Sequence, residues 1–299
     1  MSKLLNRCTL CPRCCNANRY NNETGFCNMT KDLIVARASL HFWEEPIISG
    51  KKGSGTVFFS GCNLKCVFCQ NFNISTNNFG KKISIKRLSE IFLELQNKGA
   101  NNINLVTPTH FVPQIIEALK ISKENGLSIP IVYNSSGYET IDTIKLLNGY
   151  IDIYLPDFKY FDNKYALKYS KCPNYFEYAS SALNEMVKQV GNPKFDGNRM
   201  LVKGVIVRHM LLPGLLEDSK KIIHYLVDKY NDDIFISIMN QYTPTNNLDK
   251  YKEINRTVSK NEYQELIDYA IDLGIKNGFM QEGETQKASF IPEFDTSGV

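Results

Sequence analysis

Residues 56–73 read TVFFSGCNLKCVFCQNFN and contain three cysteines, Cys62, Cys66 and Cys69, in the spacing C-x3-C-x2-C. The apolar run at 57–59 predicts a short buried strand, and the Ser-Gly pair after it predicts a turn. The three thiols therefore share one loop that follows a strand. Thiolates are the usual ligands of iron–sulfur clusters, and a four-iron cluster held by three of them keeps one iron open for a small molecule.

Two other interpretations of these thiols stay open from the residues alone. A zinc site would need a fourth ligand, and no Cys or His follows soon after Cys69. Free thiols can also pack in a core as small apolar side chains. The spacing and the flanking residues favour the cluster.

The loop, with Phe68 directly before its last cysteine, resembles the signature of radical S-adenosylmethionine (radical SAM) enzymes. The wider segment at 53–71, GSGTVFFSGCNLKCVFCQN, resembles the branch related to pyruvate formate-lyase activating enzyme. The resemblance implies a 4Fe-4S cluster on Cys62, Cys66 and Cys69, with S-adenosylmethionine chelating the open iron through its amino and carboxylate groups. It also implies reductive cleavage to a 5′-deoxyadenosyl radical, which removes a hydrogen atom from a substrate.

A second cysteine cluster lies at 8–27, in the phrase CTLCPRCCNANRYNNETGFC. This segment has too few apolar residues for a core of its own, and such segments are commonly stabilised by a metal. It resembles the C-x2-C-P-R-x-C…G-x-C segment of one subgroup of activating-enzyme-like proteins. Its matching ligands are Cys8, Cys11, Cys15 and Cys27, whereas Cys14 is at a variable position. Zinc, a second iron–sulfur cluster and no metal at all stay open as alternatives.

Composition limits the class of protein. The 299 residues are 43% apolar, which is enough for a large core, and the net charge of +4 gives no reason to expect a nucleic-acid partner. No apolar run is long enough to span a membrane, and the N-terminus has no secretory signal pattern. Nine cysteines in such a chain predict metal ligands rather than disulfides, and hence the cytoplasm. Cys172 lies outside every motif and is expected to have no role.

Strand and helix signals alternate from residue 56 onward. Apolar runs predict strands at 57–59, 103–106, 129–133, 151–155, 201–207 and 234–238. Helical spacing predicts helices at 88–95, 112–119, 141–147, 222–227 and 259–274, and a mostly helical connection at 161–190. This alternation predicts an α/β fold with a parallel sheet, and it fits the partial (β/α)6 TIM-like barrel that the resemblance implies. We expect a cysteine-rich segment and lead-in at 1–50, and the barrel with a C-terminal cover at 51–299.

Polar residues follow the second and third predicted strands, where parallel barrels carry their reactive groups. Thr107-Pro108-Thr109-His110 stands where the wider superfamily has a Gly-Gly-Glu segment that contacts the amino group of S-adenosylmethionine. Hydroxyls and carbonyls of Thr107, Thr109 and His110 can bind an ammonium, although Thr109 could instead cap the next helix. The hydroxyl-rich run of Asn134, Ser135 and Ser136 suits contacts to ribose or carboxylate, or caps the following helix.

Charged residues follow the fourth and fifth predicted strands. Asp157 and Lys159 lie on one face of an extended stretch and match the D-x-K motif of activating enzymes, which implies contacts to S-adenosylmethionine with Lys159 near its carboxylate. A surface ion pair is the alternative. Arg208, followed by an apolar run and Pro-Gly, matches an arginine that those enzymes place against the cofactor. Strand alternation directs His209 the other way. We predict that Asp157, Lys159 and Arg208 act in catalysis.

The sequence leaves the substrate open. An activating enzyme would act on a glycyl-radical enzyme, and Asn240-Gln241-Tyr242 does not match the substrate-side residues of pyruvate formate-lyase activating enzyme. Another peptide, protein or small metabolite is the alternative substrate. A non-catalytic iron–sulfur electron carrier is the third hypothesis. An electron donor such as flavodoxin or ferredoxin is expected. The segment at 41–46, with His41 and Glu44, is expected to pack as a strand or lid over the cluster edge, with a direct role for either residue as the alternative.

Overall fold

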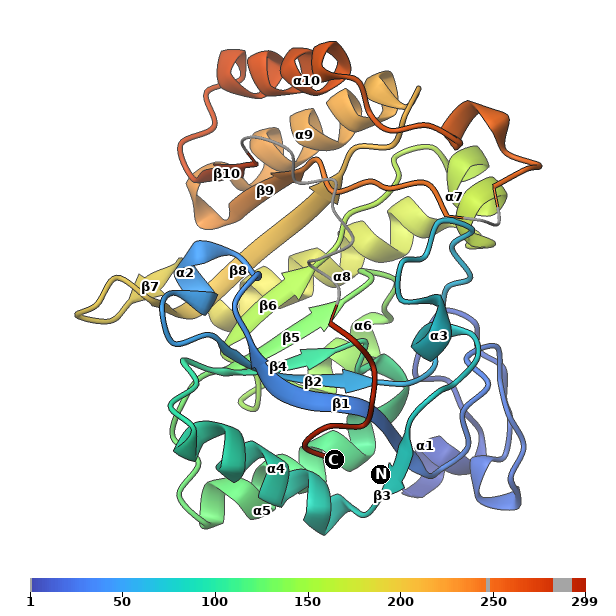
Figure 1. Ribbon diagram of the computed structural model, residues 1–299, viewed down its shortest axis with the longest axis vertical. Coiled ribbons are helices and arrows are strands. Elements are labelled where there is room, and N and C mark those ends of the chain that lie inside the picture. The colour runs from blue at the N-terminus through green and yellow to red at the C-terminus, as the bar shows by residue number, and fades with distance from the viewer. Residues whose placement is uncertain (1, 246–247, 282–291) are drawn as a thin grey trace.

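The computed structural model describes residues 2–245, 248–281 and 292–299. In this part of the chain ten strands join one sheet in the order β10-β9-β8-β6-β5-β4-β2-β1-β3, with β7 beside β8 (Figure 1). The strands are β1 (Leu33–His41), β2 (Ser54–Phe59), β3 (Lys81–Ile83), β4 (Ile103–Val106), β5 (Ile131–Ser135), β6 (Ile153–Pro156), β7 (Lys194–Phe195), β8 (Leu201–Met210), β9 (Phe235–Met239) and β10 (Gly278–Met280).

Helices cover the outer side of this sheet. The larger ones are α4 (Ile85–Asn97), α5 (Val112–Glu124), α6 (Ile141–Leu146), α7 (Asn163–Ser170), α8 (Tyr175–Val190), α9 (Leu216–Tyr230) and α10 (Lys260–Asp272). Single turns of helix are α1 (Ser2–Asn6), α2 (Pro46–Ser49), α3 (Phe72–Ser75), η1 (Arg19–Asn21), η2 (Thr109–Phe111), η3 (Asn231–Asp233) and η4 (Lys252–Ile254). The predicted capping box is confirmed, because Ser259 and Glu262 exchange both bonds at the start of α10.

All six predicted strands are confirmed as β2, β4, β5, β6, β8 and β9, and neighbours among them pair in parallel. Each is followed by at least one predicted helix, so the α/β, partial TIM-like barrel is confirmed. The apolar pattern does not reveal β1, β3 and β10, which lie toward the two ends of the sheet, or β7, which pairs antiparallel with β8. β10 pairs in parallel with β9, and β1 pairs antiparallel with β2 and β3. β3, β7 and β10 are too short to show apolar periodicity, and the longer β1 lacks a clear alternation of apolar residues, so all four escape this kind of prediction.

The end of the chain lies along β1. Thr296 donates its amide to the carbonyl of Ala36, and Ala38 donates to Ser297, at 3.0 and 2.9 Å. Arg37 forms an ion pair with Asp295 at 2.9 Å. The tail therefore packs along β1. The first residues of the expected cover, at 290–291, lie outside the described residues.

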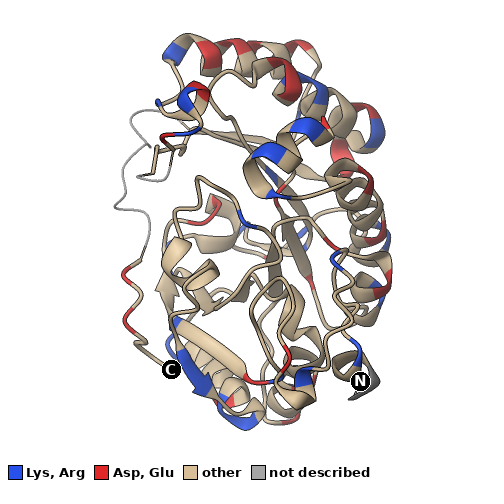
Figure 2. Ribbon diagram, turned by 90° about the vertical axis from the view of Figure 1, so that its right-hand side faces the viewer, with Lys and Arg blue, Asp and Glu red and all other residues tan. Residues whose placement is uncertain are grey.

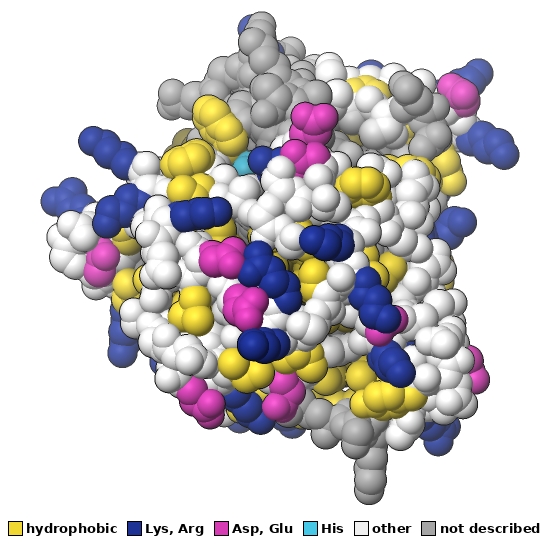
Figure 3. Space-filling view, turned by 60° about the horizontal axis from the view of Figure 1, so that its bottom comes forward, with side chains coloured by type: hydrophobic (Ala, Val, Ile, Leu, Met, Phe, Trp, Pro, Cys, Tyr) yellow, Lys and Arg dark blue, Asp and Glu magenta, His cyan; other side chains and the backbone are white. Residues whose placement is uncertain are grey.

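Charged side chains are distributed over the outside of the fold. Acidic and basic residues mix along the outer helices, whereas the strands are mostly uncharged (Figure 2). Both signs are also interspersed on the face drawn in Figure 3, without a field of a single sign. None of the described helices is long and apolar enough to cross a membrane.

Candidate functional site

The cysteine loop leaves the sheet directly after β2. Gly61 has φ +84, a left-handed conformation, and a Cβ there would lie 2.6 Å from Cγ of Met29 and 2.8 Å from the carbonyl oxygen of Cys27. Farther along, Lys65 and Val67 donate their amides to the carbonyls of Ser170 and Tyr169 at the end of α7. These contacts fix the backbone in both halves of the loop. The backbone therefore sets the positions of the three thiols.

Each of the three thiols has a donor close to its sulfur. Ser170 Oγ donates to Cys66 Sγ at 3.0 Å, Ser75 Oγ lies 3.2 Å from Cys69 Sγ, and the amide of Leu64 points to Cys62 Sγ at 3.4 Å. Donors of this kind stabilise thiolate ligands and tune an iron–sulfur cluster.

Burial raises the pKa of Cys62 to about 12 and that of Cys66 to about 11. Cys62 and Cys66 therefore need a metal to keep them ionised. Among the described residues, no three His, Cys, Asp or Glu side chains form a ready-made site for a single metal ion.

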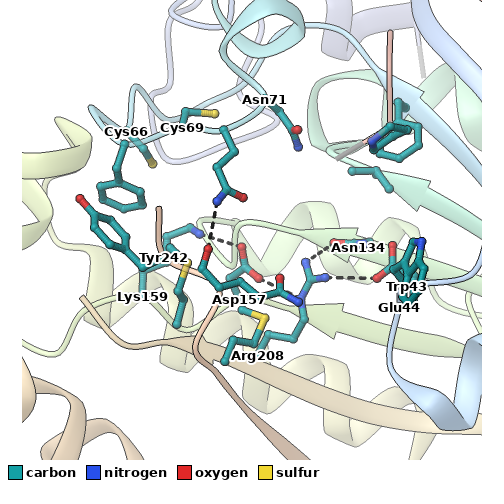
Figure 4. A pocket seen from close by; sticks show the side chains of 18 of the residues that line it. Trp43, Glu44, Cys66, Cys69, Asn71, Asn134, Asp157, Lys159, Arg208 and Tyr242 are labelled. Carbon is teal, nitrogen blue, oxygen red and sulfur yellow. Dashed lines mark hydrogen bonds and ion pairs between the residues drawn. The ribbon is translucent and has the colours of Figure 1, made fainter. Parts of the chain in front are cut away.

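A cavity of about 260 Å³ opens beside this loop, at the carboxyl ends of the strands. Cys66 and Cys69 line one side of it, and Trp43 and Glu44 line the opposite side (Figure 4). Asp157, Lys159, Asn134 and Arg208 lie between these two sides. Cys62 is half-buried in the same loop.

A chain of alternating charges crosses the cavity floor. Lys159 Nζ lies 2.7 Å from Asp157 Oδ2, and Arg208 Nε donates to Asp157 Oδ1 at 3.0 Å. The two remaining arms of Arg208 reach Glu44 Oε2 at 3.3 Å and Asn134 Oδ1 at 2.6 Å. Asp157 and Lys159 are only 18% and 19% exposed, so they do not form a surface ion pair. The D-x-K residues and Arg208, which are distant in sequence, form one network.

The burial of this network sets its protonation. Burial alone raises the pKa of Asp157, but the charges of Lys159 and Arg208 outweigh that effect and hold the pKa below its ordinary value. Burial alone lowers the pKa of Lys159, and the charges of Asp157 and Cys66 raise it above its ordinary value. For Glu44, burial outweighs Arg208, so the pKa of Glu44 is raised. Asp157 therefore stays a carboxylate between two cations.

Other predicted cofactor residues lie deeper than the cavity floor. Thr109 is buried and donates its hydroxyl to Glu139 at 2.7 Å. His110 is buried with Nε2 2.7 Å from the carbonyl oxygen of Ser60, and burial chiefly lowers its pKa to about 3. The ring is therefore neutral. Thr107 is half-exposed with φ +58, which is strained for a β-branched residue and is the kind of conformation found at functional sites.

The hydroxyl run at the end of β5 stays near the cysteine loop. Ser136 donates to Asn63 Oδ1 at 3.1 Å, and Ser135 Oγ accepts the amide of Gly137 at 3.3 Å. Thr140 caps α6, so this run does not cap that helix. As expected from strand alternation, His209 turns away from Arg208; its ring contacts the carbonyl oxygen of Phe158 at 2.7 Å and is buried.

Glu44, for which a direct role was the alternative expectation, lines the cavity. It follows β1, and its side chain reaches the centre of the barrel, where it also accepts a bond from Asn104 at 2.9 Å. The only feature that marked Glu44 in the sequence was an acidic pair before a proline. Its contact with Arg208 joins residues 164 positions apart, which no local pattern can reveal. Gln241 and Tyr242, to which the sequence assigned no role, line the cavity as well.

The N-terminal thiols pack beside the cysteine loop. Cys8 and Cys27 are buried, Cys11 is half-buried, and Cys14 and Cys15 are exposed. Burial raises the pKa of Cys11, and the charges of Cys27, Glu139 and Cys8 raise it further. Burial also raises the pKa of Cys27, to which the charges of Cys8 and Cys15 contribute. These four thiols, at Cys8, Cys11, Cys15 and Cys27, are therefore electrostatic neighbours. Cys172 is also buried, and the charges of Cys66 and Cys62 act on it.

Comparison with known proteins agrees with this geometry. Residues 56–226 match the Radical SAM superfamily. An uncharacterized protein of Methanocaldococcus jannaschii is 32% identical over 278 residues, which cover 89% of this chain and 75% of that protein. A second protein of that organism, provisionally named a glycyl-radical enzyme activating enzyme, is 30% identical over 127 residues, or 41% of this chain and 49% of the other.

The fold also has solved counterparts. The crystal structure of SuiB from Streptococcus suis bound to precursor peptide SuiA matches 76% of this chain with a TM-score of 0.50 and 13% identity. This chain spans 48% of that structure, and at such an identity the likeness concerns the fold. The family match at residues 56–226 covers more than half of this chain, and the relative that is 32% identical covers 89% of it. The chain belongs to the radical SAM superfamily.

Proposed function

We propose that this protein binds a 4Fe-4S cluster through Cys62, Cys66 and Cys69 and binds S-adenosylmethionine in the adjoining cavity. When bound, the two groups supply a 5′-deoxyadenosyl radical, which removes a hydrogen atom from the substrate. One observation carries the proposal: Cys66 and Cys69 open onto the same cavity as Asp157, Lys159 and Arg208. Metal-binding thiols and a charged ligand pocket thus share one space. An iron–sulfur electron carrier would not need the pocket.

The charged residues provide the proposed contacts to S-adenosylmethionine. Lys159 lies between Asp157 and Cys66 and is placed to hold the carboxylate of the ligand close to the cluster. Arg208 offers a planar fork of donors, and Asp157 orients both cations through its two oxygens. Asn134 holds the far arm of the guanidinium. These residues bind and orient; we assign none of them a proton transfer.

The polar strand ends complete the proposed cofactor site. Thr107 is proposed to contribute its carbonyl or hydroxyl near the ammonium group, and its strained backbone supports this role. Thr109 and His110 bond instead to Glu139 and Ser60 inside the fold, so they are not proposed as ligands. Ser135 and Ser136 are proposed for the ribose hydroxyls, and the bond from Ser136 to Asn63 next to Cys62 keeps them near the cluster loop.

For the substrate we favour a glycyl-radical enzyme, with an electron donor such as flavodoxin or ferredoxin. The support is the sequence likeness to the second relative over part of the chain. Another peptide, protein or small metabolite is the alternative, because Gln241 and Tyr242 at the cavity differ from the residues of pyruvate formate-lyase activating enzyme. Electron paramagnetic resonance of the reduced enzyme mixed with a glycyl-radical partner separates the two, since only activation produces a glycyl doublet.

We further propose a structural metal, zinc or a second iron–sulfur cluster, on Cys8, Cys11, Cys15 and Cys27, supported by their proximity. A cytoplasmic location is proposed as well, because all nine cysteines are free thiols.

Product formation tests the central proposal. Anaerobically reconstituted, reduced protein is incubated with S-adenosylmethionine, and 5′-deoxyadenosine is measured. We expect product from the wild type and from Cys14→Ala, which removes an exposed thiol outside both ligand sets, and none from Cys62→Ala. Equal traces from the wild type and Cys62→Ala would count against an enzyme and in favour of an electron carrier.

A further inference from the structure

A second cavity, of about 580 Å³, adjoins the catalytic cavity. The residues that line both cavities are Trp43, Glu44, Arg208, Met239 and Gln241. Cys66 and Cys69 line the first cavity and not the second, and in Figure 4 they lie on the side opposite to Trp43 and Glu44. A molecule in the second cavity would therefore contact one in the first across Glu44 and Arg208, on the side away from the thiols.

Exposed apolar side chains gather at the second cavity. Phe42 and Trp43, which follow β1, are 49% and 61% exposed, and Met280 in β10 is 38% exposed. All three line the cavity, together with Phe279, whose ring stacks on that of Phe235. A concave site that combines apolar walls with a few polar groups is typical of a ligand pocket, and clustered exposed apolar residues indicate a surface that binds a partner molecule.

Carboxyl groups outnumber cations along the wall between the two cavities. The charge of Arg208 acts on three carboxyl groups. Arg208 donates to two of them, Asp157 and Glu44, at 3.0 and 3.3 Å, and Lys159 pairs with Asp157 as well. The third is Glu45, with which no cation in the described part of the chain forms an ion pair. Two cations thus face three carboxyl groups, and Glu45 is the one left without a direct counter-charge.

Glu45 is buried at the second cavity with an unsatisfied oxygen. It is 8% exposed and lines the cavity, and its Oε2 has no hydrogen-bond partner among the residues that the structure describes. Burial raises the pKa of Glu45; Arg208 opposes this effect and Glu44 adds to it, so the pKa stays above its ordinary value. A buried carboxyl group in this situation either keeps a proton or is balanced by a cation. Apart from Arg208, the described residues that line the cavity include no cationic side chain, so a further cation would come from a ligand.

We propose that the second cavity binds an organic cation, an ammonium or guanidinium group on an apolar stem, and that Glu45 is the residue that selects it. The cation bonds to the carboxylate of Glu45, and the stem packs against Phe42 and Met280. Binding forms no covalent bond, and any proton on Glu45 leaves to solvent. A lysine or arginine side chain of a peptide carries such a group, and so does a free amine or guanidine. That this ligand is the substrate rests on the proposed function, because a hydrogen donor must lie next to S-adenosylmethionine.

Binding of matched probes to the reconstituted, full-length protein with S-adenosylmethionine bound tests the site. Nα-acetyl-arginine and Nα-acetyl-lysine methylamides represent peptide side chains, n-butylguanidine and n-butylamine represent free cations, and Nα-acetyl-citrulline methylamide is the neutral control. Affinities come from calorimetry, and the fluorescence of Trp43, the one tryptophan of the chain, reports whether the probe enters this cavity.

We expect at least one cationic probe to bind about tenfold or more tightly than the neutral control, because its bond to Glu45 is charge-assisted. A higher affinity for the methylamides than for the butyl compounds identifies a peptide as the source of the cation, and the reverse order identifies a free amine or guanidine. Equal affinities for cationic and neutral probes, or no binding of any probe, overturn the proposal.

The role of Glu45 has its own signature. Glu45→Gln keeps the shape of the side chain and should weaken the cationic probe about tenfold or more while the neutral control binds as before. Phe42→Ala, the second variant, should weaken both probes, because it removes part of the apolar wall. Glu124→Gln, at the exposed end of α5, is the control. A loss of affinity for S-adenosylmethionine in Glu45→Gln would place Glu45 in the cofactor site and overturn the assignment.

The probe titrations separate this inference from the proposed function, because they require no turnover. Wild-type protein that forms 5′-deoxyadenosine but does not prefer cations contradicts the inference alone. Cation-selective binding that depends on Glu45, in protein that forms no 5′-deoxyadenosine, supports the site and contradicts the proposed reaction.

Discussion

Replacing Asp157 by asparagine removes the one anion that bridges Lys159 and Arg208. The carboxylate makes two charge-assisted contacts, at 2.7 and 3.0 Å, and its side chain is 18% exposed. An asparagine amide keeps one acceptor but turns an NH2 group toward a cation. Breaking a buried pair costs about 3 to 5 kcal/mol, and Arg208 keeps its contacts with Glu44 and Asn134, so we expect a loss of about 2 to 4 kcal/mol in the free energy of unfolding.

The matched control is Asp232→Asn. Asp232 pairs with Lys276 at a similar distance, 2.8 Å, but the two side chains are 44% and 69% exposed. An exposed pair contributes about 0 to 1 kcal/mol. Unfolding 299 residues changes the entropy by about 0.6 kcal/mol per kelvin, so Asp157→Asn should lower Tm by about 3 to 6 °C and the control by less than about 2 °C.

The assay is thermal unfolding of both variants and the wild type under anaerobic conditions, with the same cluster content in every sample. Equal Tm values for Asp157→Asn and Asp232→Asn would refute the reasoning, because they would show that the D-x-K pair is solvated like a surface pair.

Three more predictions follow from the site. Arg208→Lys loses the fork and should weaken binding of S-adenosylmethionine about tenfold or more without changing the circular dichroism spectrum, as titration calorimetry measures; an unchanged affinity contradicts the proposed contact. Burial lowers the pKa of His110 to about 3, so its neutral ring contributes stability that is complete above about pH 6.5 and is lost as the pH falls toward 3. The difference in unfolding free energy between wild type and His110→Gln should therefore shrink between pH 7 and pH 4, and a constant difference argues against a neutral buried ring. Cys27→Ser should speed the loss of iron from the catalytic loop to a chelator severalfold relative to Cys14→Ser, and equal rates indicate that the two thiol sets are uncoupled.

Local patterns predicted the parts of the site that depend on neighbours in sequence. The spacing of Cys62, Cys66 and Cys69 placed the thiols on one loop, and the two-residue spacing of Asp157 and Lys159 placed both charges on one side of the chain, where the structure has them in contact. Six parallel strands were predictable because each contains a run of buried apolar residues.

Contacts between distant segments could not be read from the sequence. Glu44 acquires its position only when β1 folds back antiparallel along β2, and β1 lacks a clear alternation of apolar residues. Likewise, nothing around Arg19 indicates that it will be buried against Cys27 and His110, because a charged residue in a polar segment is normally exposed. For Thr109 the hydroxyl suggested a helix cap or a ligand contact, but folding brings Glu139 next to it.

The account depends on an iron at Cys62, Cys66 and Cys69 that no side chain ligates. Electron paramagnetic resonance of the reduced protein, recorded before and after addition of S-adenosylmethionine, tests this most directly, and the N-terminal Cys8→Ser/Cys27→Ser variant removes overlap from any second centre. We predict a 4Fe-4S signal that shifts when S-adenosylmethionine is added and that is absent from Cys62→Ala. A signal that S-adenosylmethionine leaves unchanged, or the absence of any 4Fe-4S signal from the wild type, would contradict the account.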